Sequence, residues 1–77
     1  MTAYVPSETD EKKINNNFTY HAPKEDQAKR YEKIRDTAKE LAFLLTTLCP
    51  PSRELSVALT ELETAIMWAN AAIARNE

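Results

Sequence analysis

Two runs of apolar residues, separated by a pair of prolines, constrain the fold of this chain more than any other feature. In each run the apolar residues recur at alternating spacings of three and four, a period typical of helices that pack along one seam. The first run contains Tyr31, Ile34, Ala38, Leu41, Leu45 and Leu48, and the second contains Leu55, Leu59, Leu62, Ile66, Ala69 and Ile73. The pattern therefore predicts two helices packed against each other.

Prolines and a serine mark the ends of both helices. Pro23 suits a first helical turn, where its missing N–H would be unpaired anyway, so the sequence predicts a helix over residues 23–48. The proline pair cannot continue that helix, and Ser52 is a natural N-cap for a second helix over residues 52–75. Two helices joined by so short a connection are expected to form an antiparallel hairpin.

A short helix is expected before the hairpin. Ser7 is a good N-cap, and the Asp10 carboxylate can reach back to the backbone of Ser7 in a variant of the capping box. The helix should end near Asn15, at a run of three asparagines. Residues 1–17 are predicted to form an N-terminal arm, and residues 1–77 a single all-α domain.

A chain of 77 residues can build only a thin hydrophobic core. A domain of this size buries about 60% of the surface of its unfolded chain, so such domains usually need a disulfide, a metal or self-association. One cysteine excludes an internal disulfide, and one cysteine with one histidine argues against a structural zinc site. Assembly into a helical homo-oligomer is the support that remains.

A second apolar surface supports that expectation. On a helical wheel, Phe43 points away from the first seam, and Val57 and Trp68 point away from the second. Together with Met67 they form the predicted oligomer interface, because a contiguous exposed apolar patch usually marks an interaction site. A second interpretation, compatible with the first, is that the short N-terminal helix folds back and covers them.

Charge and hydropathy exclude two classes of partner. The formal net charge of −2 and the pI near 5.4 argue against a protein that binds DNA or RNA duplexes. There is no apolar run of about 18 residues and no signal-like segment with a basic start and an apolar centre. We therefore expect a soluble, intracellular protein with no membrane partner.

The sequence also argues against catalysis. A nucleophile needs a base beside it, and His21 with Cys49 is the only conceivable pair. These residues lie at opposite ends of a predicted helix roughly 37 Å long. No phosphate-binding loop, EF-hand or zinc-protease motif occurs. We therefore expect no enzyme, no cofactor and no metal.

The segment from Phe18 to Arg35 joins the arm to the hairpin and combines aromatic with basic residues. Tyr20 or Phe18 could stack on a nucleobase, a contact that tolerates any base. Lys24 and Arg35 could neutralise phosphate groups, and arginine can bind two oxygens at once. This segment is therefore the candidate site for an anionic ligand that carries an aromatic ring.

A purely structural interpretation of the same residues stays open. Phe18 and Tyr20 could pin the arm to the hairpin, while Tyr31 forms the first core layer and His21 caps a helix. Arg75 has two interpretations as well, since it complements the negative end of the second helix and could line an anionic site in an oligomer.

Four strings occur in order along the chain: FTYHAP at 18–23, YEKIR at 31–35, CPPSRE at 49–54 and MWANAAIAR at 67–75. Their combination resembles the phage anti-CBASS cyclic-oligonucleotide sponge family, whose hairpin is shared with sponges that act against Thoeris signalling. The resemblance implies small helical homohexamers in the host cytoplasm. They would sequester cyclic dinucleotides, and in some members cyclic trinucleotides at a separate site, without catalysing a reaction.

The resemblance also implies a set of ligand-binding residues: Tyr20, His21, Lys24, Lys33, Arg35 and Arg75. Tyr20 would stack on a base, and Lys24 or Arg35 would contact phosphate, with Lys33 able to replace Arg35. Arg75 would belong to a trinucleotide site near the oligomer axis.

The competing hypothesis is a small helical protein-interaction module with no nucleotide ligand. It would bind its partner through the surface that contains Phe43 and Trp68.

Overall fold

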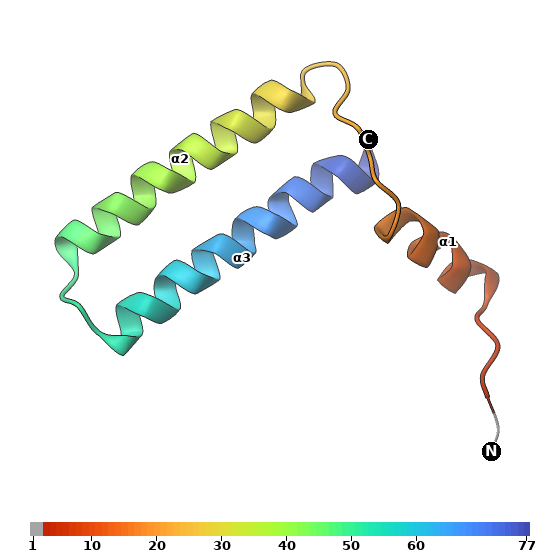
Figure 1. The fold of residues 1–77 in the computed structure, drawn as a ribbon, viewed down its shortest axis with the longest axis horizontal. Helices are drawn as coiled ribbons and strands as arrows, with labels where there is room; N and C mark the ends of the chain where they lie inside the picture. Colours follow the sequence, from red (N-terminus) through yellow and green to blue (C-terminus); the bar gives the residue numbers. More distant parts are fainter. Residues whose placement is uncertain (1–2) are drawn as a thin grey trace.

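The computed structural model describes residues 3–77 and places three helices in them. α1 spans Glu8–Asn17, α2 spans Gln27–Leu48 and α3 spans Arg53–Asn76. α2 and α3 lie antiparallel, side by side, and α1 extends away from the end of the hairpin that holds the C-terminus (Figure 1). The described residues contain no strand, so the all-α prediction of a short helix followed by a hairpin is confirmed.

α1 begins as its sequence predicted. The Asp10 N–H donates to Ser7 Oγ and the Ser7 N–H donates to Asp10 Oδ2, both at 3.0 Å. These bonds form a complete capping box, and the bond from the Ser7 backbone is the main cause that lowers the pKa of Asp10. The asparagine run does not end the helix at Asn15, because α1 continues to Asn17.

α2 begins at Gln27, so the predicted start at Pro23 is wrong. The Gln27 side-chain oxygen accepts the N–H of Lys24 at 3.1 Å, and the Lys24 carbonyl accepts the N–H of Gln27 at 3.0 Å. Between them Glu25 adopts φ 53°, in the left-handed region. This turn closes on itself and delays the helix, so the helix N-terminus lies at Asp26 and Gln27 and not at Lys24.

Replacing Glu25 by glycine is expected to stabilise the protein. A residue with a Cβ pays roughly 1–2 kcal/mol in the left-handed conformation, and part of this cost is offset by the greater backbone freedom that glycine has when unfolded. We expect the melting temperature to rise by a few degrees, as measured by circular dichroism. Glu32→Gly, inside α2, is the matched control and should lower it. A lower melting temperature for Glu25→Gly would contradict the assignment of strain to this turn.

The connection between α2 and α3 follows the sequence. Cys49 is extended, with φ −112° and ψ 140°, and its N–H donates to the Leu45 carbonyl at 2.9 Å. Ser52 then caps α3, because its Oγ accepts the Leu55 N–H at 3.1 Å. The two prolines leave no helical geometry between these caps, so the chain reverses within four residues.

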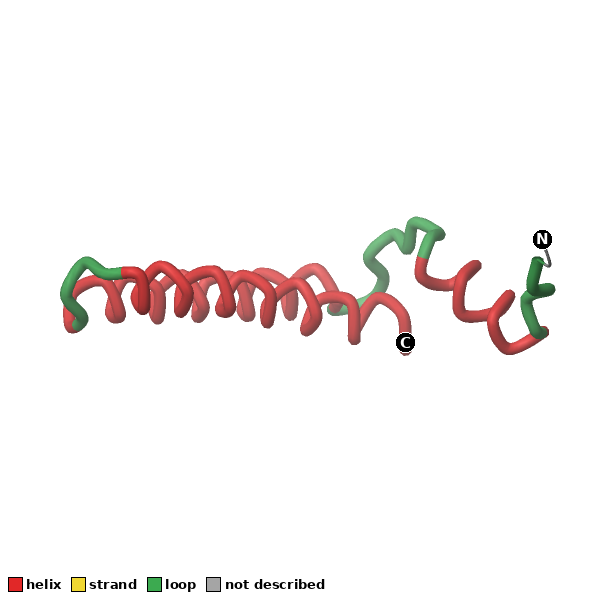
Figure 2. Tube along the Cα trace, turned by 90° about the horizontal axis from the view of Figure 1, so that it is seen from below, coloured by secondary structure: helices red, strands yellow, loops and turns green. Residues whose placement is uncertain are grey.

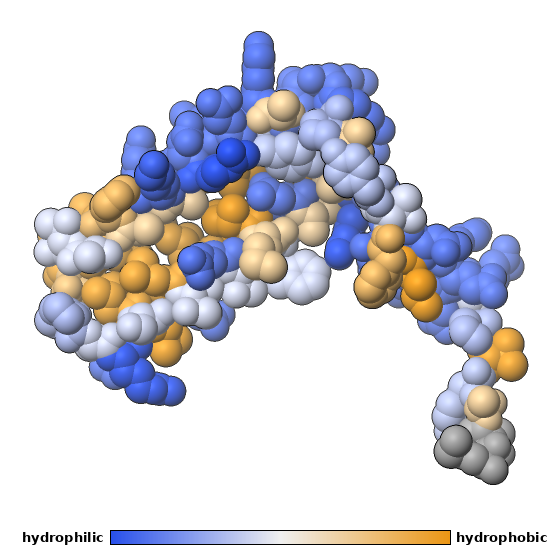
Figure 3. All heavy atoms as spheres, viewed as in Figure 1, coloured by the Kyte–Doolittle hydropathy of each residue, from blue (hydrophilic) through white to orange (hydrophobic). Residues whose placement is uncertain are grey.

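The molecule is flat, measuring 51 × 41 × 13 Å, and the hairpin is one helix thick when seen from its edge (Figure 2). No apolar side chain in residues 3–77 is buried, and Gln27 is the one buried side chain among them. Figure 3 shows apolar atoms gathered along the seam between the two helices, open on the face in view. One chain therefore has a seam but no enclosed core.

α1 does not cover the apolar surface of the hairpin, so that interpretation is wrong. Phe43 is 65% exposed and Trp68 63% exposed, and α1 lies beyond the end of the hairpin in both ribbon and tube views (Figures 1 and 2). The interpretation that Phe18 and Tyr20 pin the arm to the hairpin is wrong too, because they are 86% and 83% exposed. No helix in residues 3–77 combines the length and hydropathy that a bilayer crossing requires.

Candidate functional site

Hydrogen bonds fix the segment between α1 and α2 against the end of α3. Asn16, in the last turn of α1, donates its side-chain N–H to the Arg75 carbonyl at 3.1 Å. The Asn16 carbonyl in turn lies 2.8 Å from His21 Nε2. A carbonyl can only accept, so His21 carries its hydrogen on Nε2 and caps the C-terminal end of α1. The prediction that His21 caps a helix is confirmed.

A polar clasp joins the open ends of the hairpin. Arg30 Nη1 donates to Glu77 Oε2 at 2.7 Å, and its other terminal nitrogen donates to Glu77 Oε1. Gln27 adds a bond from Nε2 to Glu77 Oε1 at 3.3 Å. The hydrogen bonds from Arg30 and then Gln27 lower the pKa of Glu77 to about 2, and the bond with Glu77 raises the pKa of Arg30. The clasp therefore holds a charged carboxylate against the start of α2.

This clasp predicts a loss of stability in acid. The pKa of Glu77 is lowered from 4.5 to about 2, so its stabilising contribution is present above pH 4.5 and is lost as the pH falls towards 2. Glu77→Gln should lower the melting temperature at pH 7 by a few degrees and by progressively less towards pH 2. Thermal melts across this range check it. Glu61→Gln, on the exposed surface of α3, is the control and should give no such trend. Parallel curves for wild type and Glu77→Gln would contradict the clasp.

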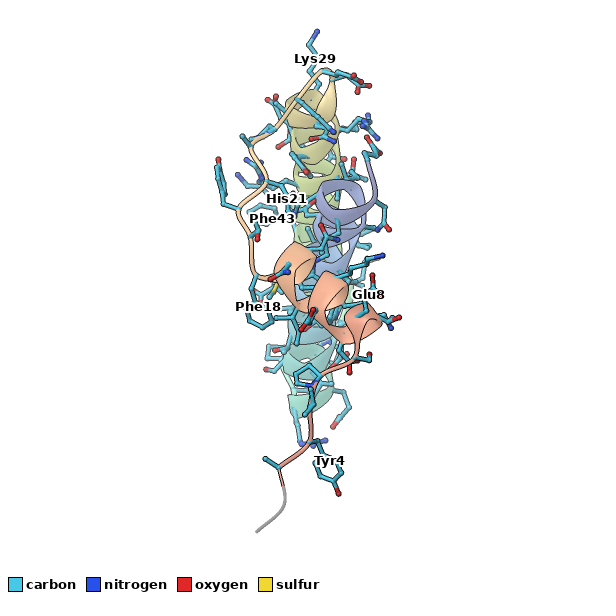
Figure 4. All side chains as sticks on the ribbon, turned by 90° about the vertical axis from the view of Figure 1, so that its right-hand side faces the viewer. Tyr4, Glu8, Phe18, His21, Lys29 and Phe43 are labelled. Carbon is cyan, nitrogen blue, oxygen red and sulfur yellow. The ribbon has the colours of Figure 1, made fainter. Side chains whose placement is uncertain are left out.

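Between the fixed segment and the hairpin lies an open cavity of about 340 Å³. It is lined by Tyr20, His21 and Pro23 from the segment, Tyr31 and Arg35 from α2, and Asn70, Ala71 and Ala74 from α3. His21 lies along this segment, whereas Tyr4 and Lys29 lie at opposite ends of the view in Figure 4. The alanines leave the space, because side chains longer than a methyl group would fill it.

The structure brings together three of the six predicted ligand-binding residues. Tyr20, His21 and Arg35 line the cavity. Lys33 lines a different hollow of about 350 Å³, beside Ile34 and Leu62. Lys24 and Arg75 do not line the cavity either; the Arg75 guanidinium lies 5.8 Å from the centre of the Trp68 ring. This separation makes Arg35 the basic residue best placed to meet an anion beside Tyr20.

Sequence reasoning did not assign Tyr31 or Asn70 to the site. Tyr31 was expected in the core, but it lines the cavity together with Tyr20. Asn70 is the polar residue in the otherwise apolar string MWANAAIA, and this isolation was the available signal. Its side-chain oxygen has no solvent-accessible surface and no hydrogen-bond partner in residues 3–77.

The cavity has the chemistry of a binding site for an anionic aromatic ligand. Two tyrosines offer ring faces or hydroxyl groups, Arg35 offers a positive charge, and Asn70 adds a polar residue to the cavity lining. No cluster of metal-ligating residues occurs in the part of the chain that the structure describes. Cys49 follows the C-terminal end of α2, whereas His21 precedes its N-terminal end, so these two residues cannot act as a pair within one chain.

The predicted interface residues are exposed. Phe43, Val57, Met67 and Trp68 are 65%, 42%, 69% and 63% exposed. Met67 also lines the largest hollow described here, about 670 Å³, together with Leu59, Leu62 and Ile66. Arg35 lines this hollow as well as the smaller cavity, so the candidate site and the apolar face meet at one side chain.

The sequence model of the family described as "Acb2/Tad1, hairpin domain" matches residues 10–74. The match includes most of α1, all of α2 and α3 as far as Ala74, and therefore every residue that lines the cavity. Searches of curated proteins and of solved structures gave no match.

Proposed function

The chain belongs to the Acb2/Tad1 hairpin family, the sponge family that opposes CBASS and Thoeris immunity, and we propose that it sequesters cyclic oligonucleotides without altering them. The ligands would be cyclic dinucleotides that activate a host CBASS effector. The observation that carries the proposal is one cavity that combines Tyr20, Tyr31 and Arg35. Keeping the messenger away from its effector requires only that the protein bind it, and the cavity offers groups for binding.

The side chains of the cavity suit the two parts of such a ligand. Tyr20 is 83% exposed, so its ring is free to stack on a base, and such stacking contributes about 1–3 kcal/mol. Arg35 lies on the same cavity wall as Tyr31 and can donate two parallel hydrogen bonds to a phosphate. Lys24 and Lys33 lie outside this cavity and would add long-range attraction for the phosphates.

The shape of the cavity supports a homo-oligomer. Ligand sites usually occupy about 300–1,000 Å³ and bury most of the ligand. This cavity, at about 340 Å³, is near the lower end of that range, and it is open to solvent, so one chain would leave much of a ligand exposed. A second chain packed on the exposed face around Met67 and Trp68 would deepen it, and the family resemblance favours a hexamer. Arg75 would then belong to a separate site for cyclic trinucleotides near the oligomer axis.

The place of action would be the host cytoplasm, where an infected cell makes the messenger. This follows from the family and from the proposed ligand.

Calorimetric titration tests the proposal. Purified protein at micromolar concentration is titrated with 3′,3′-cyclic GMP-AMP and with other cyclic di- and trinucleotides, and heat denaturation of the complex follows. We expect saturable binding and release of chemically intact ligand, detected by chromatography. Absence of heat and of thermal shift with every member of the panel would refute the sponge, and a cleaved ligand would show an enzyme instead.

The second candidate function is a protein-interaction module, favoured by the exposure of Phe43 and Trp68. A protein of that kind would give no heat with any cyclic nucleotide. The same titration therefore separates the two functions.

A further inference from the structure

A single hydrogen bond connects the N-terminal arm to the hairpin. Asn16, in the last turn of α1, donates its side-chain N–H to the Arg75 carbonyl at 3.1 Å. That carbonyl lies in the last turn of α3, where backbone carbonyls have no partner within the helix. No other hydrogen bond or ion pair in the described part of the chain joins residues 3–23 to α2 or α3. The position of α1 beside the hairpin (Figure 1) therefore depends on this side-chain amide.

The residues on both sides of Tyr20 are tied to the end of α1. His21 Nε2 donates to the Asn16 carbonyl at 2.8 Å, and the Thr19 hydroxyl donates to the Asn15 carbonyl. Tyr20 itself is 83% exposed, so apolar packing within the chain does little to hold its ring. The Tyr20 ring should therefore move with the end of α1.

The cavity lies between this segment and the hairpin. Tyr20, His21 and Pro23 line it from the segment, and Arg35 is among the residues that line it from the two long helices. The Pro23 end of the segment is attached to α2 through the turn that precedes that helix. The other end is held against α3 by Asn16. The separation between the tyrosine ring and the guanidinium therefore depends on the Asn16 bond.

Resting on the proposed function, we propose that Asn16 is a positioning residue, which holds the Tyr20 ring at the cavity before the ligand binds. Asn16 does not line the cavity, so it acts through Tyr20 and not by touching the ligand. A ring that must first be ordered binds more weakly than one already in place, because ordering side chains and loops reduces affinity. The Asn16 amide raises the affinity by making that ordering unnecessary.

Asn16→Ala removes the donor to Arg75 but keeps the two bonds beside Tyr20, since their acceptors are backbone carbonyls. Alanine favours the helix more than asparagine does, so α1 should stay folded. We expect the affinity for cyclic dinucleotides to fall about tenfold, which corresponds to ordering one or two side chains on binding. Asn15→Ala is the matched control, because Asn15 precedes it in α1, is exposed and makes no side-chain hydrogen bond within residues 3–77. Its affinity should equal that of wild type.

A double-mutant cycle separates positioning from a general loss of structure. Calorimetry compares the full-length wild type, Asn16→Ala, Tyr20→Ala and the double variant. The probe is whichever of 3′,3′-cyclic GMP-AMP, cyclic di-AMP and cyclic di-GMP binds the wild type most tightly. Asn16→Ala should weaken binding about tenfold when the ring is present and less than about twofold in the Tyr20→Ala background. A general loss of structure would weaken binding equally in both backgrounds.

The remaining outcomes overturn the inference. A wild-type protein that binds none of the three ligands refutes the proposed binding of cyclic dinucleotides and this inference with it. Three results would refute the positioning role alone and leave the sponge function intact: an unchanged affinity for Asn16→Ala, equal losses for Asn16→Ala and Asn15→Ala, or a loss that persists in the Tyr20→Ala background.

Discussion

Tyr20→Ala is expected to weaken the binding of cyclic dinucleotides by roughly 5- to 150-fold, because it removes a base-stacking contact worth about 1–3 kcal/mol. Tyr20 lines the cavity and is 83% exposed, so the truncation removes little packing within the chain. The oligomer measured by light scattering should keep its size. Calorimetry with 3′,3′-cyclic GMP-AMP measures the loss.

Two matched variants sharpen this test. Tyr20→Phe keeps the ring and should retain most of the affinity. Tyr4→Ala removes a tyrosine that is 96% exposed and lies outside the cavity, so its affinity should equal that of wild type. Equal losses for Tyr20→Ala and Tyr4→Ala would show that the stacking platform has been misassigned.

Trp68→Ala is expected to break the assembly that the exposed face predicts. Buried tryptophans at interfaces often contribute about 2 kcal/mol or more, so the dissociation constant of each contact should rise by about 30-fold. The side chain is 63% exposed in the single chain, and its ring lies against the Arg75 guanidinium. Light scattering over a dilution series should show smaller species for the variant at concentrations where wild type is assembled.

The control for the assembly is Phe18→Ala, which removes an aromatic side chain that is 86% exposed and directly follows α1, outside the two hairpin helices. It should leave the oligomer unchanged. A wild-type chain that stays monomeric at every concentration would contradict both the interface and the shared ligand site.

Assembly and ligand binding are expected to be linked through Arg35. This side chain lines the small cavity beside Tyr31 and also the larger apolar hollow beside Met67. A partner packed in the hollow would hold the guanidinium towards the cavity. Trp68→Ala should therefore weaken ligand binding as well, although Trp68 does not line the cavity.

Much of the local structure followed from the sequence. The capping box at Ser7, the reversal at the two prolines and the seam spacing are short-range features, and the structure has them where they were expected. The start of α2 was predicted wrongly for an equally local reason. The Gln27 side chain accepts the Lys24 N–H, and Glu25 adopts a positive φ, so a turn forms where the helix was expected to start. The preference of proline for a first helical turn takes no account of such a turn.

The site was predictable only in part. An aromatic and basic segment next to the hairpin indicated Tyr20 and Arg35, and both line the cavity. Three other basic residues of the predicted set do not line the cavity: Lys24, Lys33 and Arg75. The charge of a residue in the sequence does not tell where its side chain will lie after the chain has packed. Asn70 stands out as a polar residue in an apolar string, but only the packing of α3 beside the segment shows that it lines the cavity.

The sequence by itself determined the three helices, the reversal between the long pair and the exposed apolar stripe, since each depends on residues within one or two helical turns of one another. The tertiary structure alone decided which residues share a site. Arg30 meets Glu77 across 47 positions and Asn16 meets Arg75 across 59, and these bonds set the path of the segment that carries Tyr20 and His21. The apolar seam determines only that the two long helices pack together. The long-range polar bonds at their open end determine where the cavity lies.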